Sequence, residues 1–127
     1  MQDDRQWITI FAFVEDKSKE GRILSVAKIG DVYMSRLMIE PGVLTGNLYH
    51  QEAKVMFYVE RGSILALFEH IDTKERQELL LEPGKHVVHV PTRVAHSTKN
   101  IGRETAVIVF LTSHRLRSGD DYPYSIQ

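Results

Sequence analysis

Histidine is the residue type in this chain with the clearest capacity for chemistry. The 127 residues include six histidines and no cysteine. Without cysteine there is no thiol nucleophile, no disulfide and no cysteine-ligated zinc or iron–sulfur site. Imidazole titrates near neutral pH, which suits proton transfer, and its nitrogens ligate zinc, iron or manganese. Acidic residues, tyrosine, lysine and arginine must supply any further chemistry.

The composition is that of one ordinary globular domain. Lys and Arg total 16 against 17 Asp and Glu, so the formal net charge is −1, and 43% of the residues are hydrophobic. This is not the basic balance of a protein that binds nucleic acid or an anionic membrane. No apolar run approaches the ~20 residues that span a bilayer, and the N-terminal MQDDRQWITI lacks the layout of a signal peptide. We expect a single domain over residues 1–127, located in the cytoplasm.

Short strands must position the histidines, because the apolar pattern has a period near two along most of the chain. Val, Ile, Phe, Tyr and Thr dominate these stretches, and turn dipeptides such as Pro41-Gly42 and Pro83-Gly84 separate them. The pattern predicts an all-β sandwich or barrel. Strands are expected over residues 22–29, 31–39, 55–59, 63–70, 79–81, 86–90 and 105–112.

The remaining segments predict connections and termini. Residues 15–21 are charged without an apolar stripe, which indicates a loop, and residues 72–78 are polar on all faces, which indicates a hairpin connection. Residues 1–21 form an N-terminal arm with an edge strand. Residues 115–127 form an irregular tail whose tyrosines could anchor it on the barrel.

Two spaced motifs make the fold prediction more specific. Gly42 is followed by Leu48-Tyr49-His50, Val55 and Gly62 at the intervals of the first cupin motif. Residues 91–96 (PTRVAH) resemble the second cupin motif. The chain is therefore similar to the cupin superfamily, which implies a double-stranded β-helix, or jelly-roll barrel.

A closer resemblance is to the cupin domain that ends bifunctional capsular-polysaccharide enzymes acting on nucleotide-linked deoxysugars. It rests on residues 41–50 (PGVLTGNLYH), on the turn Asn100-Ile101-Gly102 and on the run Asp120-Asp121-Tyr122. The wider group contains the deoxysugar epimerase and ketoisomerase cupins. The resemblance implies a role in surface-polysaccharide biosynthesis.

The same resemblance implies an incomplete metal site. Cupins commonly place ligands at the first and third positions of the triplet, at the position of Val55, and at the histidine of the second motif. This chain keeps His50 and His96 but has Leu48 and Val55 at the other two positions. Two imidazoles hold a divalent ion weakly, and His89 is a poor candidate for a third ligand. We therefore expect no metal cofactor.

Metal-independent proton transfer stays open. The related epimerases and ketoisomerases use a histidine base and a tyrosine acid, which implies His50 as base and His96 as its partner or a second base. Tyr58 and Tyr33 are candidate acids. Strand alternation allows either Tyr58 or its two neighbours, but not both, to line the barrel.

Arginines could bind the diphosphate of a nucleotide sugar, because guanidinium groups bind such anions with two hydrogen bonds. Arg36 and Arg93 lie in or beside the motif frame, and Arg93 replaces a usual glycine. Arg36 binds ligand if its strand face lines the barrel and is structural if that face is outside; we favour the former. The expected ligand-binding residues are Arg36, Arg93 and His89.

Three functions remain open. The first is a sugar-nucleotide epimerase or isomerase, and the second is a non-catalytic cupin that binds a small polar ligand through a degenerate site. The third is a metal-dependent small-molecule enzyme, which Leu48 and Val55 disfavour. Fold alone does not decide among them.

The expected protein partner is a second copy. Residues 7–14 (WITIFAFV) are apolar and have no place in the motif frame. An exposed edge of this composition is an aggregation hazard, and a partner's sheet would cover it. We expect a homodimer and no nucleic-acid or membrane partner.

Overall fold

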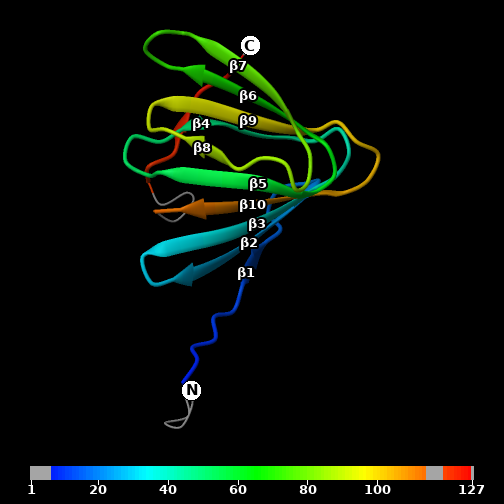
Figure 1. Cartoon of the computed structure of the whole chain (residues 1–127), viewed down its shortest axis with the longest axis vertical. Coiled ribbons are helices and arrows are strands. Elements are labelled where there is room, and N and C mark those ends of the chain that lie inside the picture. Colours follow the sequence, from blue (N-terminus) through cyan, green and yellow to red (C-terminus); the bar gives the residue numbers. More distant parts are fainter. Residues whose placement is uncertain (1–6, 114–118, 127) are drawn as a thin grey trace.

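The chain folds as two antiparallel β-sheets packed face to face, seen here in a computed structural model (Figure 1). The structure describes residues 7–113 and 119–126. These residues contain eleven strands and no helix, which confirms the all-β double-stranded β-helix. The strands are β1 (Val14–Asp16), β2 (Arg22–Ile29), β3 (Val32–Ile39), β4 (Leu44–Tyr49), β5 (Val55–Arg61), β6 (Ile64–His70), β7 (Arg76–Leu81), β8 (Val88–Val90), β9 (Val94–Asn100), β10 (Ala106–Thr112) and β11 (Tyr122–Pro123). No helix long and apolar enough to cross a membrane occurs in the described residues.

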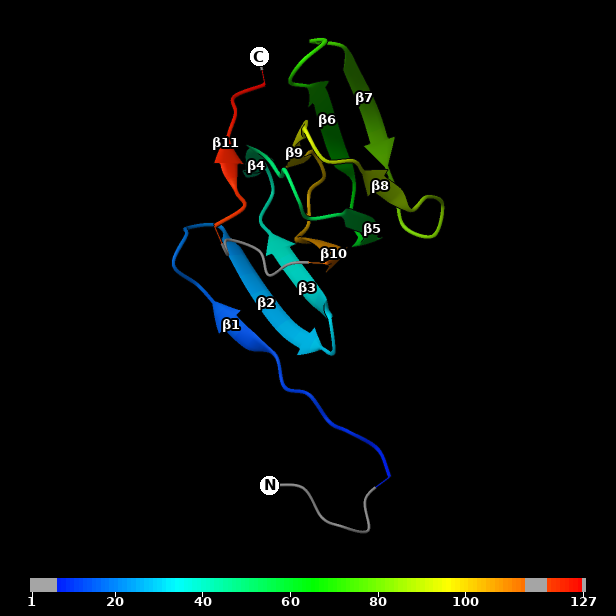
Figure 2. The ribbon, with the colours of Figure 1, turned by 90° about the vertical axis from the view of Figure 1, so that its left-hand side faces the viewer.

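Strand order brings the two motifs together. One sheet has the order β1-β2-β3-β10-β5-β8, and the other has the order β11-β4-β9-β6-β7 (Figure 2). The Leu48-Tyr49-His50 triplet of the first motif lies at the end of β4 and just after it, and the histidine of the second motif, His96, lies near the start of β9. The two strands pair with Leu48 opposite His96. The pairing therefore places the two histidine-bearing segments side by side.

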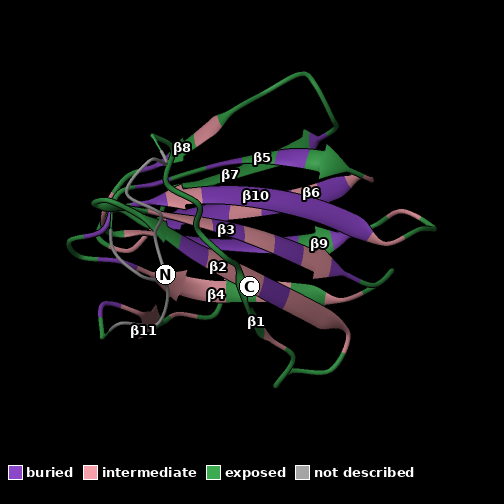
Figure 3. Ribbon diagram, turned by 90° about the horizontal axis from the view of Figure 1, so that it is seen from below, coloured by how far each residue is buried: buried purple, intermediate pink, exposed green. Residues whose placement is uncertain are grey.

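Alternation along the strands builds the core. On β5, Val55 and Phe57 point inward and are 1% exposed. The Phe57 ring lies 5.1 Å from Phe110 and 6.4 Å from Phe68, so aromatic side chains from both sheets meet between the layers. β10 is buried along most of its length (Figure 3). This packing fixes which face of each strand lies inside.

Several stretches differ from the sequence prediction. Residues 76–78, expected as part of a hairpin connection, begin β7, where pairing with β6 holds a polar edge strand. Residues 15–16, expected in a loop, belong to β1. β4 and β9 were identified only as motif frames, because glycine, asparagine, lysine and histidine interrupt the apolar pattern there.

The two ends of the chain lie differently. Residues 7–13 leave β1 and extend away from the body of the protein (Figures 1 and 2). In the C-terminal segment, β11 pairs with β4 and Tyr122 stacks on Tyr49 at 5.3 Å. Part of the expected tail, residues 115–118 and 127, lies outside the described residues.

Gly46 permits the close approach of β4 to β9. Its φ is +96°, and a Cβ there would lie 2.7 Å from the His96 carbonyl oxygen and 3.0 Å from Ser97 Cα. Both neighbours are backbone atoms, so the strands would have to separate. Only glycine fits this position without strain.

We expect Gly46→Ala to lower the free energy of unfolding by about 2–4 kcal/mol, through backbone strain plus overlap with β9. Gly84→Ala is the matched control, because Gly84 also has a positive φ (+77°) but open space around it; we expect about 1 kcal/mol there. Urea unfolding measures both. Equal losses of stability in the two variants would show that the close approach of Gly46 to β9 adds nothing to the cost of the substitution.

Candidate active site

A cavity of about 100 Å³ lies inside the barrel between the two sheets. His50 and His96 line it, with only 4% and 7% of their surfaces exposed, and their ring centroids are 5.9 Å apart. The structure thus brings these two predicted residues into one cavity. Their catalytic role remains a prediction.

Hydrogen bonding fixes the orientation of the His50 ring. Its Nδ1 lies 2.9 Å from the Asp120 carbonyl oxygen and 3.2 Å from Asp121 Oδ1. A carbonyl oxygen only accepts, so Nδ1 carries the hydrogen. In the neutral ring, Nε2 then carries a lone pair, and this buried atom has no hydrogen-bond partner among the described residues. His50 is arranged as a base with its free nitrogen inside the protein.

Asp120 anchors the segment that orients His50. Its carboxylate accepts hydrogen bonds from the backbone N–H groups of Gln51 (3.1 Å), Glu52 (3.1 Å) and Ala53 (2.8 Å). Burial acts to raise the pKa of this carboxyl, but the three N–H donors outweigh it and hold the pKa below its usual value. Asp120 is therefore a positioning residue that clamps the loop after β4.

The second motif also contacts His50 through its backbone. The Arg93 N–H donates to the His50 carbonyl oxygen at 2.8 Å. Arg93 has a φ of +63°, the left-handed region that favours glycine, which accounts for the glycine common at this motif position. The Arg93 turn thus holds the backbone of His50 beside the second motif.

Burial keeps His96 neutral. Loss of solvent, with the nearby His50 as a second cause, lowers the pKa of His96 to about 4. Its Nδ1 is buried and has no hydrogen-bond partner among the described residues. A neutral imidazole retains one N–H and one lone pair, so His96 can donate or accept a hydrogen bond near His50.

The rest of the cavity combines an apolar wall with a few polar groups. The hydroxyls of Thr45 and Thr98 lie 2.7 Å apart, and Lys19 and Arg22 bring two cations. Sequence reasoning assigned these four residues no role, because none of them stands at a ligand position of the motifs. The apolar lining is Leu24, Leu37, Leu48 and Phe110.

Tyr58 lies away from the cavity, which corrects its predicted place in the site. It alternates with the inward-facing Phe57 and Val59, so it faces outward and is 37% exposed. Tyr33 is half-buried at the start of β3, where Lys28 Nζ lies 5.7 Å from its ring, and it does not line the cavity.

The predicted ligand-binding residues also lie elsewhere. Arg36 is on the outer face of the six-stranded sheet, where its guanidinium pairs with Glu60 at 3.0 Å, so the favoured inward orientation is wrong. Arg93 donates two hydrogen bonds to Asp72 on the surface, at 2.8 and 2.5 Å. His89 is exposed on β8, beside a separate surface cavity of about 250 Å³.

Comparison with known proteins identifies the family. A model of the polysaccharide biosynthesis C-terminal domain family matches residues 17–121. The chain belongs to this family. No curated protein sequence matches it as a close relative.

Solved structures share this fold. The capsular polysaccharide assembling protein CapF from Staphylococcus aureus superposes with a TM-score of 0.81 at 22% identity, over 90% of this chain and 33% of CapF. The family member described here thus spans about a third of CapF's length. CapF with the inhibitor 3-isopropenyl-tropolone gives a TM-score of 0.80 at 19% identity, covering 90% of this chain and 34% of that one.

Oxalate decarboxylase and oxalate oxidase structures share the fold as well. Oxalate decarboxylase from Bacillus subtilis, which has Mn(II) centres, matches with a TM-score of 0.72 at 19% identity, over 80% of this chain and 29% of that one. Recombinant oxalate oxidase with glycolate gives 0.67 at 18% identity, over 76% and 53% of the two chains. At these identities the likeness concerns the fold alone.

The donor set in this family member does not fit a metal ion. Leu48 lines the cavity beside His96, and Val55 is sealed into the apolar core. Nδ1 of His50 faces the Asp120 carbonyl and the Asp121 carboxylate. The Asp121 carboxylate therefore lies on the opposite side of the ring from Nε2, the nitrogen that would bind a metal. No three His, Asp or Glu residues within 7–113 and 119–126 are grouped to hold an ion. We derive no chemical step through a metal.

We expect Asp120→Ala to lower the free energy of unfolding by about 2–4 kcal/mol, because three backbone N–H groups lose a charged acceptor. Asp72→Ala is the matched control; it removes an exposed pair with Arg93 and should change stability little. Chemical denaturation measures both. Similar losses would contradict a clamp at Asp120.

The depressed pKa of His96 predicts a loss of stability in acid. An unfolded histidine titrates near 6.5, whereas folded His96 titrates at about 4. Below pH 6.5 the unfolded chain binds more protons, so stability falls as the pH drops, by roughly 3 kcal/mol once the pH is below 4. Denaturation between pH 7.5 and 4 should show this slope reduced in His96→Gln and retained in His86→Gln, an exposed control. An unchanged slope in His96→Gln would contradict the assignment.

Proposed function

We propose that this protein is a metal-independent epimerase or isomerase that acts on a nucleotide-linked keto-deoxysugar in surface-polysaccharide biosynthesis, in the cytoplasm. The observation that carries the proposal is the state of His50: its Nδ1 is held by Asp120 and Asp121, and its Nε2 is buried and free of protein partners. Membership of the polysaccharide biosynthesis family supports the substrate class.

The proposed step is proton transfer beside the sugar ketone. Nε2 of His50 takes the proton, the C–H bond breaks, and its electron pair moves to the carbonyl oxygen to give an enolate. The carboxylate of Asp121, 3.2 Å from Nδ1, stabilises the imidazolium that forms. Return of a proton to the other face of that carbon yields an epimer. Where that carbon bears a hydroxyl, protonation of the enolate oxygen gives an enediol; a proton then adds to the former carbonyl carbon and the hydroxyl proton is lost, which yields the isomeric ketone.

Neutral donors in the cavity serve the enolate oxygen. His96 stays uncharged at neutral pH and can donate its remaining N–H, and the hydroxyls of Thr45 and Thr98 are nearby donors. These groups take the place that sequence reasoning gave to Tyr58.

The size of the cavity indicates how a nucleotide sugar would bind. A volume of about 100 Å³ is below the ~300–1,000 Å³ of a pocket that encloses a whole ligand. We therefore place the keto-sugar inside the barrel and the nucleotide outside. Lys19 and Arg22 line the cavity and have the charge to meet the diphosphate.

A second candidate is a non-catalytic cupin that binds a small polar ligand. The observation that favours it is the absence of tyrosine from the cavity lining among the described residues. In this reading, His50 and His96 serve as hydrogen-bonding groups and transfer no proton.

Incorporation of deuterium separates the two functions. We expect the protein in deuterated water to exchange the hydrogen beside the ketone of nucleotide-linked 4-keto-6-deoxysugars, read by mass spectrometry or NMR. His50→Gln should reduce the rate at least ~100-fold, because it removes the base. His89→Gln and Tyr58→Phe should retain it, and chelator-treated protein should exchange at the untreated rate.

Exchange in the wild type that survives His50→Gln would overturn the assignment of the base. Binding of these sugars by calorimetry without exchange would favour the non-catalytic function. Loss of exchange on removal of a stoichiometric metal would overturn metal independence.

A further inference from the structure

The C-terminal segment, residues 119–126, forms a strap along the outer edge of β4. Its strand β11 pairs with β4, and the strap continues beyond β11 toward the hairpin between β6 and β7 (Figure 2). Near the start of the strap, Asp120 and Asp121 contact the His50 ring, and Asp121 also lines the cavity. The groups that hold the proposed base therefore belong to the strap, and their positions depend on where the strap lies.

Backbone pairing by itself specifies the register of the strap weakly. β11 consists of Tyr122 and Pro123, and proline has no N–H to donate. With so few backbone hydrogen bonds, little opposes a slip of one residue, which would turn Tyr122 to the other face. The same slip would move Asp121 along the strand by about 3.3 Å, away from Nδ1 of His50. Side-chain contacts are needed to fix the register.

Tyr124 anchors the far part of the strap on the hairpin between β6 and β7. Its hydroxyl donates a hydrogen bond to the carboxylate of Glu69 and accepts one from Lys74 Nζ at 3.0 Å. The Glu69 side chain is 6% exposed, and its other oxygen accepts a hydrogen bond from Arg76. Lys74 Nζ also lies 5.1 Å from the centre of the Tyr124 ring. The phenol is thus held by charge-assisted hydrogen bonds on both sides.

The charged groups of this network stabilise one another. The hydrogen bond from Tyr124, and next that from Arg76, hold the pKa of the Glu69 carboxyl below its usual value, although burial acts to raise it. The same phenol raises the pKa of Lys74. Lys74 has a φ of +65°, which glycine or asparagine adopts more readily. Its ammonium contact with the phenol is a reason for lysine at this strained position.

Tyr124 is also tied to β4 beside the proposed base. Its N–H donates to the Asn47 carbonyl oxygen at 2.8 Å, and its ring meets the Tyr49 ring edge to face, with the centroids 6.1 Å apart. Tyr49 stacks on Tyr122 and is followed in the chain by His50. Tyr124 therefore fixes the strap relative to the segment that carries the base.

We propose that Tyr124 is a positioning residue for the His50 base. Its hydroxyl, locked between Glu69 and Lys74, fixes the register of the strap. The register in turn keeps Asp121 against Nδ1 of His50. Tyr124 does not line the cavity, so it acts through the strap and not on the substrate. Its effect on the reaction rate rests on the proposed function, whereas its effect on the His50 ring does not.

NMR of the histidine ring nitrogens in the full chain tests the positioning without substrate. In mildly alkaline buffer, where the ring is neutral, we expect His50 to show the Nδ1–H tautomer. Its Nδ1 hydrogen should exchange slowly with water, because it is buried and hydrogen bonded. Tyr124→Phe keeps the ring and removes the hydroxyl; it should speed this exchange at least ~10-fold and mix the tautomers. Tyr58→Phe is the matched control, because it removes an exposed hydroxyl on the outer face of the other sheet.

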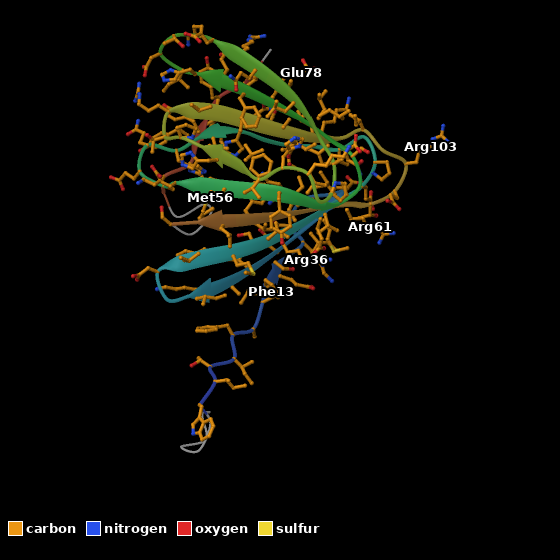
Figure 4. All side chains as sticks on the ribbon, in the orientation of Figure 1. Phe13, Arg36, Met56, Arg61, Glu78 and Arg103 are labelled. Carbon is orange, nitrogen blue, oxygen red and sulfur yellow. The ribbon has the colours of Figure 1, made fainter. Side chains whose placement is uncertain are left out.

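A second pair of variants tests the network around the phenol. Glu69→Gln removes the charge that Tyr124 and Arg76 contact, and it should change the His50 ring signals in the same direction as Tyr124→Phe. Glu78→Gln is its control, because this exposed carboxylate lies on β7, the strand beside β6 (Figure 4). Tyr124→Phe added to Glu69→Gln should change the signals little further, because the two substitutions break the same hydrogen bond.

The deuterium assay measures the consequence for the reaction. Tyr124→Phe should lower kcat at least ~10-fold and leave KM within ~2-fold of the wild-type value, because it displaces the base and contacts no substrate. Circular dichroism verifies that each variant is folded. If the wild type exchanges no deuterium, the proposed function fails, and the ring signals alone decide the role of Tyr124.

Ring signals that stay unchanged in Tyr124→Phe, or that change equally in Tyr58→Phe, would overturn this role. A rise in KM with kcat unchanged would do the same, because it would place the hydroxyl in substrate binding.

Discussion

The contacts of Asp120 set the orientation and tautomer of the His50 imidazole, on which the proposed chemistry depends. Its carboxylate holds three backbone N–H groups of the loop after β4, and its carbonyl accepts the Nδ1 hydrogen of His50. One residue therefore fixes the loop and selects the tautomer of the ring. With Nδ1 engaged, the unprotonated Nε2 is the nitrogen left for proton transfer. The neighbouring His96 and the threonine pair gain their proposed roles only because His50 is held this way.

The interior of the barrel holds a packed core and a cavity. Leu48 and Val55, the two residues that stand at usual ligand positions, lie in different parts of it. Val55 joins the aromatic core, whereas Leu48 faces the cavity. Their apolar side chains remove two metal donors and leave surroundings of low polarity. In such surroundings His96 stays neutral, and hydrogen bonds to a developing charge are stronger than they are in water. Leu48, which stands at a usual ligand position, thus belongs to the apolar surroundings in which His96 stays neutral.

Alternation divides the six-stranded sheet into an inner face, which packs the core and lines the cavity, and an outer face. Phe57 and its neighbours two residues away pack inside, which turns Tyr58 outward. Arg36 lies outward for the same reason and pairs with Glu60 rather than with a ligand. Two side chains that resembled site residues in the sequence, Arg36 and Tyr58, therefore lie on the outer face of the sheet.

The two-residue period of apolar side chains and the spacing of the two motifs predicted much of the fold. The two-residue period predicted most strands, and the interval from Gly42 to Asn100 predicted the cupin barrel. That interval also singled out His50 and His96 and showed that Leu48 and Val55 replace the other ligands. These features can be read from the sequence because each depends on residue types and intervals along the chain, and not on which distant strands make contact. β4 and β9 were not predicted as strands, because Gly46 and the polar residues of β9 interrupt the two-residue apolar period.

Only the tertiary structure decided which face of each strand looks inward, since alternation fixes relative facing but not which side meets the opposite sheet. It also decided what holds His50, because Asp120 lies seventy residues away and reaches the ring only after β11 pairs with β4. Lys19, Arg22 and Thr98 also line the cavity only because the fold brings distant parts of the chain together. The sequence by itself determined the barrel and its two histidines. The orientation, protonation and neighbours of those histidines arise from contacts between strands that are distant in the chain.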